Sequence, residues 1–370
     1  MSSLNDLDAI IFSPSADDLT VVAGGDVVLA TTITAADGST VFDNTSTYSP
    51  GADGLVHLAE LSELVNAAVL LSLKPSTMLT TGLRTASCQL TILATSDTLH
   101  DQKQCRALYM WRDMTEIKPM FATQVRNRRF IEGVPQPVSV LTAGMANLKL
   151  VVGAAYRTAG GLQWKEITMQ PDCSADYFTL LADPDSIRLA TSAPDGATLL
   201  YYVLTLYDLA SQQLDCIRFD PDRKTRPSSA THFVYYNLFG VPECITFRGK
   251  SEEHQELDTD FGYAGREYVR LNAAVTESHK VNSGWLTKEE RHAVYDFMSS
   301  PCACVYIGGE LHRITITELD SSISRPTSEP DSVSLTWRMA DERFMRTPCV
   351  APDMGGKPIF AKPPFDKTFD

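Results

Sequence analysis

The chain has 370 residues, 44% hydrophobic and 21% charged, with 32 Lys and Arg against 46 Asp and Glu and a formal net charge of −14. This much apolar material is enough for two or three packed domains, which excludes a largely disordered chain. Phosphate repels an acidic protein, which excludes stable nucleic-acid binding through counterion release. The acidity suits a solvated surface, or the wall of a channel through which DNA slides.

The N-terminal run Met1-Ser2-Ser3-Leu4-Asn5-Asp6 lacks the basic segment and apolar run of a signal peptide. The most apolar stretch, near 67–73, is much shorter than the ~20 residues that span a bilayer. We therefore expect a chain that is made in a cytoplasm and does not insert into a membrane.

The first 220 residues follow a period of two, which is typical of strands. The β-branched run 27–34 leads to Asp37-Gly38, a strong hairpin signal, and Val41-Phe42 begins the return strand. One exception is 59–71, where apolar residues recur at helical spacing and favour a short helix over the alternative, a buried strand with a helical prelude. Further strands are predicted over 88–94, 104–111, 138–141, 148–156, 163–169, 197–207 and 214–219.

The polar, Pro-bracketed segment 220–229 predicts a linker before a C-terminal domain. In that domain Thr287 and Glu290 form a capping box, which predicts a helix over about 287–299. The acidic stretch Ser251–Asp260 is interpreted as a loop. Strands are predicted over 231–236, 243–248, 266–277, 302–307, 310–319 and 332–340.

These elements predict a mainly β fold of antiparallel β-sandwich domains, because short strands between Gly, Pro, Asp and Ser clusters are typical of sandwiches. The predicted division is an N-terminal sandwich over 1–118, a second sandwich over 119–226, a β domain with one helix over 231–345, and an arm over 346–370. In this Pro-rich arm, Phe360, Phe365 and Phe369 are spaced like anchors. It is either unstructured or ordered on a neighbouring subunit.

No motif for catalysis is present: the chain has no G-x-S-x-G, P-loop, H-E-x-x-H or G-x-G-x-x-G. The seven histidines are isolated from one another, and the eight cysteines include no C-x-x-C pair. We therefore expect no catalytic residues, no cofactor, no metal site and no enzymatic activity. The carboxylates of 251–260 could serve a glycosidase only as a pair at a defined separation.

A short basic cluster, Arg126, Arg128 and Arg129, stands out in this acidic chain. It could contact phosphate, although the net charge opposes this. The preferred hypothesis is an inter-subunit salt bridge to an acidic segment such as 251–260.

Two stretches resemble structural proteins from the tails of phages and prophages of gut Bacteroidetes. The first is Val41-Phe42 followed by Tyr48-Ser49-Pro50-Gly51-Ala52-Asp53-Gly54-Leu55-Val56-His57-Leu58. The second runs from Phe233 to Phe344 and includes Gly284-Trp285-Leu286 and Leu335-Thr336-Trp337-Arg338. This second stretch resembles the tail-tube and distal-tail family, which implies a β-sandwich with one helix, repeated around a ring whose lumen passes DNA.

The leading hypothesis is thus a virion structural protein of a tail tip, distal tail or baseplate, with itself and other tail proteins as partners. One alternative is a glycan-binding or host-surface adhesion protein built from sandwiches. Another is a glycoside-active enzyme with paired carboxylates.

Overall fold

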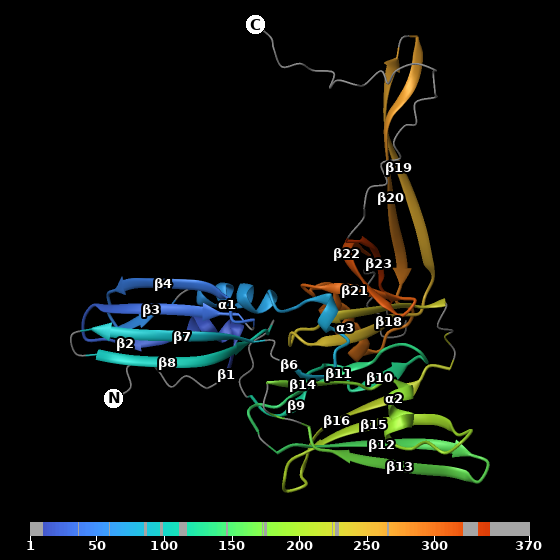
Figure 1. Ribbon diagram of the computed structural model, residues 1–370, viewed down its shortest axis with the longest axis horizontal. Coiled ribbons are helices and arrows are strands. Elements are labelled where there is room, and N and C mark those ends of the chain that lie inside the picture. The colour runs from blue at the N-terminus through green and yellow to red at the C-terminus, as the bar shows by residue number, and fades with distance from the viewer. Residues whose placement is uncertain are drawn as a thin grey trace.

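The computed structural model describes residues 10–340 except 36, 59, 85–86, 97–98, 111–116, 146, 172, 174–175, 224, 226–228, 265 and 321–331. This part of the chain is mainly β, with 54% strand and 13% helix, which confirms the predicted fold class. Three β units meet at one junction, and a long hairpin projects from the third (Figure 1). No helix among the described residues is long and apolar enough to cross a membrane.

The N-terminal unit is a five-stranded sheet in the order β1-β8-β7-β3-β4, with α1 (Leu61–Leu70) packed on one face. Buried and more exposed residues alternate along β3, as the period of two predicts. Helix α1 confirms the helix predicted over 59–71. The strands are β1 (Ile10–Phe12), β2 (Thr20–Val22), β3 (Val27–Thr34), β4 (Thr40–Tyr48), β5 (Leu55–His57), β7 (Ser87–Ser96) and β8 (Leu99–Leu108), with 3-10 helices over Ser13–Asp18 and Pro75–Thr77.

The middle unit is a sandwich of two sheets, in the orders β10-β16-β15-β12-β13 and β6-β14-β11-β9, around one apolar core. Strand β6 comes from the N-terminal segment, and β10 pairs in parallel with β16. Helix α2 (Pro184–Ala190) is a short helix whose start is marked by the Asp183 cap and by Pro184 at its first position. The strands are β6 (Gly82–Arg84), β9 (Met120–Phe121), β10 (Asn127–Phe130), β11 (Pro137–Leu141), β12 (Lys149–Thr158), β13 (Gly161–Met169), β14 (Tyr177–Leu181), β15 (Thr198–Tyr207) and β16 (Gln213–Pro221).

The C-terminal unit is a seven-stranded sheet in the order β18-β17-β21-β22-β23-β20-β19, with α3 (Lys288–Met298) on one face. Thr287 and Glu290 form the predicted capping box. The strands are β17 (Thr231–Tyr236), β18 (Pro242–Phe247), β19 (Ser251–Ala264), β20 (Glu267–Asn282), β21 (Ala303–Ile307), β22 (Glu310–Asp320) and β23 (Ser334–Met339).

Strand β17 is buried on both faces. Phe233 and Tyr235 pack in the core beneath α3, whereas Val234 and Tyr236 pack in a second core that the three units share. This explains why the strand is a continuous apolar run without alternation.

Polar contacts reinforce the shared core. The Tyr236 hydroxyl donates to the Lys74 carbonyl at 2.9 Å, and the Tyr177 hydroxyl donates to the Phe239 carbonyl at 3.1 Å. Arg106 of β8 lies 3.1 Å from Asp176, whose side chain is fully buried. Each of these contacts joins two of the three units.

Replacing Phe297 by Ala should reduce the free energy of unfolding of the chain by about 3–5 kcal/mol, because it leaves a cavity in the core of the C-terminal unit. The Phe297 ring is fully buried, with its centroid 4.9 Å from that of Phe233 and 5.3 Å from that of Tyr235. Denaturant unfolding followed by near-UV circular dichroism measures the change. Tyr295→Ala, at a partly exposed position of the same helix, is the control and should cost less than about 1 kcal/mol. Equal losses in the two variants would contradict the packing described here.

Candidate functional site

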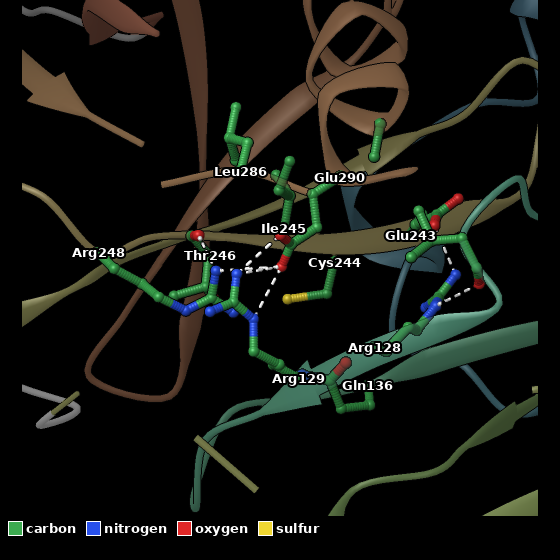
Figure 2. A pocket seen from close by; sticks show the side chains of 12 residues that line it. Arg128, Arg129, Gln136, Glu243, Cys244, Ile245, Thr246, Arg248, Leu286 and Glu290 are labelled. Atoms are coloured by element: carbon green, nitrogen blue, oxygen red, sulfur yellow. Dashed lines mark hydrogen bonds and ion pairs between the residues drawn. The ribbon is translucent and has the colours of Figure 1, made fainter. Parts of the chain in front are cut away.

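Two arginines of the basic cluster predicted from the sequence, Arg128 and Arg129, lie on β10, at the edge of the sandwich that faces the C-terminal unit (Figure 2). Arg126 directly precedes this strand. Successive side chains of a strand point to opposite faces. Arg128 accordingly reaches Glu243 of β18, and Arg129 reaches Glu290 of α3. This strand therefore presents two cations to two different elements of the neighbouring unit.

Arg128 and Glu243 form a buried pair, with 6% and 3% of their surfaces exposed. Arg128 Nη2 lies 2.5 Å from Glu243 Oε1 and 2.6 Å from Thr123 Oγ1. The Glu243 carboxylate also accepts bonds from the Thr123 hydroxyl and the Asn237 amide, each at 2.7 Å. Buried charges cost several kcal/mol each unless such bonds satisfy them. The network therefore ties the start of β18 to the segment before β10.

Glu290 is shared by two arginines. Its carboxylate accepts two bonds at 2.7 Å from Arg129 Nη2 and lies 3.4 Å from Arg248 Nη1, while Arg248 Nε donates to Asp222 at 2.6 Å. Burial alone would raise the pKa of Glu290, but the hydrogen bond from the Thr287 backbone and the bonds and charge of Arg129 lower it below its ordinary value of 4.5. The pKa of Arg248 is lowered by burial and by the nearby charge of Arg129.

Arg126 is paired within the chain as well. Its Nη2 lies 3.0 Å from Asp215, and the backbone N–H groups of Arg126 and Asn127 donate to Glu289 at 3.1 Å. Within this chain Arg126, Arg128 and Arg129 already have carboxylate partners, and their bridge to a second subunit stays a prediction. Their carboxylate partners lie in the same chain, because β10 is packed between β16 and the C-terminal unit.

A small cavity of about 40 Å³ lies among these side chains (Figure 2). It is far below the roughly 300–1,000 Å³ of a small-molecule site but has room for ordered water. Arg128 Nη1, which has no hydrogen-bond partner among the described residues, is a natural contact for such a water. No group of three or more His, Cys, Asp or Glu in the described part of the chain is arranged to hold a metal ion. The cluster thus acts as a clamp between two units.

The acidic segment 251–260, interpreted above as a loop, is instead part of β19. Strand β19 pairs with β20 along its whole length. The first residue pair is Ser251 with Val281, and the last is Ala264 with Glu267. Only 279–282 of β20 pair with β23, so the ribbon projects beyond the sheet for roughly 35 Å at ~3.4 Å per residue (Figure 1). A strand rich in Glu and Asp resembles a loop in sequence because this ribbon has no core behind it to require apolar residues.

Aromatic side chains gather at the end of this hairpin. The Phe261 and Tyr268 rings stack at 5.1 Å, and the Tyr263 centroid lies 5.1 Å from that of Tyr268. All three are exposed, by 47%, 62% and 78%, as is Leu257 by 53%. Strand alternation places Leu257, Phe261 and Tyr263 on one face. We call these three residues and Tyr268 the aromatic face.

The opposite face of the ribbon is acidic. Alternation along β19 assigns Glu256 and Asp260 of the projecting part to it, whereas Glu252 lies at the base of the ribbon, paired with Lys250 and opposite Lys280. The prediction of a loop over 251–260 did not include this division into two faces. The signal was present as Leu257, Thr259, Phe261 and Tyr263 at every second position. The predicted anchors Phe360, Phe365 and Phe369 lie outside the described residues.

No protein-family model matches the chain, and no curated protein matches it. Among solved structures, squid arrestin is similar over 56% of this chain and 88% of the arrestin chain, at 10% sequence identity and a TM-score of 0.15. A score this low carries no argument about fold or function.

Replacing Arg128 by Met should reduce the free energy of unfolding by about 3–5 kcal/mol, because it leaves Glu243 buried without its counter-charge. Arg188→Met is a matched control, since Arg188 pairs with Glu132 and Asp185 on the surface and should contribute less than about 1 kcal/mol. Denaturant unfolding of the full chain compares the two variants. Similar losses of unfolding free energy in the two variants would show that the buried Arg128–Glu243 pair does not hold the two units together.

Acid should weaken the clamp through Glu290. Because the pKa of the folded Glu290 carboxyl is lowered, its ionised form stabilises the fold fully above the ordinary pKa of 4.5 that the carboxyl has in the unfolded chain. That stabilisation is lost as the pH falls through the lowered pKa that the Glu290 carboxyl has in the folded chain. The melting temperature should therefore drop between about pH 5 and pH 3, and less steeply in Glu290→Gln. Glu63→Gln, at an exposed position of α1, controls for loss of a carboxylate. A wild-type pH profile in Glu290→Gln would contradict this role.

Proposed function

We propose that the chain is a non-enzymatic structural protein that assembles with copies of itself into a closed ring through the β19–β20 hairpin. The observation that carries this proposal is the hairpin itself, a long two-stranded ribbon. Where it extends beyond β23, no other strand of the described residues pairs with either of its edges. Its position at the end of a body of three packed units makes it the element best suited to reach another molecule (Figure 1).

Physical chemistry explains why such a ribbon needs a partner. A two-stranded hairpin is marginally stable in water by itself, and its open edges present unpaired N–H and C=O groups. If the β20 edge of one copy pairs with the β19 edge of the next, each edge is satisfied by the same contact repeated. A repeated head-to-tail contact closes into a ring when its rotation allows, and a closed ring of strands has no open edge.

The two faces of the ribbon suit the two sides of such a ring. Pairing leaves the aromatic face to pack against a further protein surface, where exposed aromatic side chains bury a large area. The acidic face, with Glu256 and Asp260, would line the lumen. An acidic lumen repels DNA and lets it slide without adhering.

We extend the proposal to a virion protein of a phage tail, in the tail tip, distal tail or baseplate, with other tail proteins as partners. The resemblance of residues 233–344 to tail-tube and distal-tail proteins supports this extension. The fold is compatible with it, since the C-terminal unit is a β-sheet that carries one helix, α3. The tail assignment depends on that resemblance, whereas self-assembly depends on the hairpin.

Light scattering and negative-stain imaging of the purified chain test the assembly. We expect rings for the wild type and monomers for a chain in which residues 255–277 are replaced by Asn-Gly. This turn joins His254 to Ser278, which already pair, and leaves the contacts of β20 with β23 in place. A narrower variant, Phe261→Ser with Tyr263→Ser and Tyr268→Ser, should retain rings but lose stacking or docking between them.

The control removes exposed apolar side chains elsewhere. Leu189→Ser with Leu209→Ser alters two of the most exposed leucines of the middle unit and should leave the rings intact. A wild-type chain that stays monomeric at high concentration would contradict self-assembly. Rings in the shortened chain would contradict the role of the hairpin.

A further inference from the structure

Trp164 lies on the outer face of the sandwich, away from its core. Along β13 the residues Ile167 and Met169 pack toward the core, so alternation directs Trp164, Glu166 and Thr168 outward. The Trp164 side chain is 51% exposed, although an indole of this size is usually buried. This strand lies on the side of the molecule opposite to the β19–β20 hairpin (Figure 1).

The sheet is shaped to support the indole. A Cβ atom added to Gly153 of β12 would lie 2.1 Å from Trp164 Cζ2, so the ring occupies the space that a side chain would fill. The indole N–H donates to Glu166 at 3.2 Å, which anchors one edge of the ring. The indole is therefore held in one orientation against the sheet while half of its surface faces solvent.

The rim of this ring is polar. Tyr201 of β15 lies beside the indole, with 6.2 Å between ring centroids. Arg218 of β16 lies over Tyr201, 4.1 Å from the ring centroid, and forms two hydrogen bonds with Asp220. A flat aromatic surface is thus bordered by a guanidinium and by carboxylates.

An open, polar cavity of about 470 Å³ lies at the end of the same two strands. Its polar lining comes from Asn147, Lys149, Thr168, Gln170, Asp208 and Ser211. Lys149 and Thr168 belong to the outward-facing rows of β12 and β13, the rows that include Gly153 and Trp164. Trp164 and Thr168 are four positions apart along β13, which is roughly 14 Å.

We propose that this outer face binds an uncharged oligosaccharide, with Trp164 stacking on one sugar ring and the polar cavity holding the hydroxyls of another. A sugar ring has an apolar C–H face and a rim of hydroxyls, which matches an exposed indole beside amide, hydroxyl and charged groups. The separation of the two subsites selects an oligosaccharide over a monosaccharide. The net charge of −14 disfavours anionic polymers.

Isothermal titration of the full chain with cellohexaose, maltohexaose, chitohexaose, mannohexaose and hexagalacturonate tests the proposal. We expect at least one of the four uncharged sugars to bind. Trp164→Ala should weaken that binding roughly tenfold or more through loss of the stacking contact. Gly153→Ala should weaken it similarly, because the added methyl displaces the indole while the strand backbone accepts alanine. Thr168→Val should weaken binding of the hexasaccharide but not of the matching disaccharide.

Trp285→Ala is the matched control, since Trp285 is a more exposed indole, on the C-terminal unit. It should leave the affinity unchanged. The proposal is overturned if none of the uncharged sugars binds, if hexagalacturonate binds more tightly than they do, or if Trp164→Ala and Trp285→Ala have equal effects. If Gly153→Ala does not fold, as judged by its circular dichroism, the comparison of the two tryptophan variants still decides. The titration measures sugar binding and does not depend on ring formation, so a failure of this proposal can be distinguished from a failure of the proposed assembly.

Discussion

Burial of β17 on both faces is the constraint on which the arrangement of the C-terminal unit depends. Its odd-numbered residues Phe233 and Tyr235 complete the core under α3, and the even-numbered Val234 and Tyr236 complete the core shared by the three units. Neither core can form fully without the same strand. Asn237, directly after β17, extends the coupling, because its amide donates to both Ala122 and Glu243. The three units are therefore expected to behave as one body.

Buried charge gives this body its orientation. Apolar contacts are not directional, whereas Arg128 and Glu243 satisfy each other only in one relative position of β10 and β18. Buried ion pairs add little net stability compared with apolar side chains of the same size, but they penalise misaligned packing strongly. Glu290 adds a second fixed point, because it caps α3 and accepts bonds from Arg129. A defined orientation is what a repeating assembly requires, since an error in the angle between subunits accumulates around a ring.

The two proposed surfaces lie at opposite ends of this body (Figure 1). The β19–β20 hairpin carries little core of its own and offers backbone edges and an aromatic face, which suit protein partners. The outer face of the sandwich instead offers one supported indole and a polar cavity, which suit a hydroxylated ligand. Their separation means that one surface can be occupied without blocking the other. A ring built through the hairpins would display many copies of the sandwich face, and repeated weak sites raise the avidity for a polymer.

The sequence by itself determined what depends on neighbours along the chain. The period of two gave the strands, Thr287 with Glu290 marked the start of α3, and apolar spacing marked α1. Contacts between distant residues had no such signal: Arg128 finds Glu243 across 115 positions, and β6 joins a sheet of the following unit. Strand β19 carries an alternating signal over 257–263, but its acidic start carries none, since alternation of apolar residues is required only where one face is buried. Local hydrogen bonding and periodicity act within a few residues, whereas packing alone decides which charges are paired inside the protein and which aromatic side chains remain on its surface.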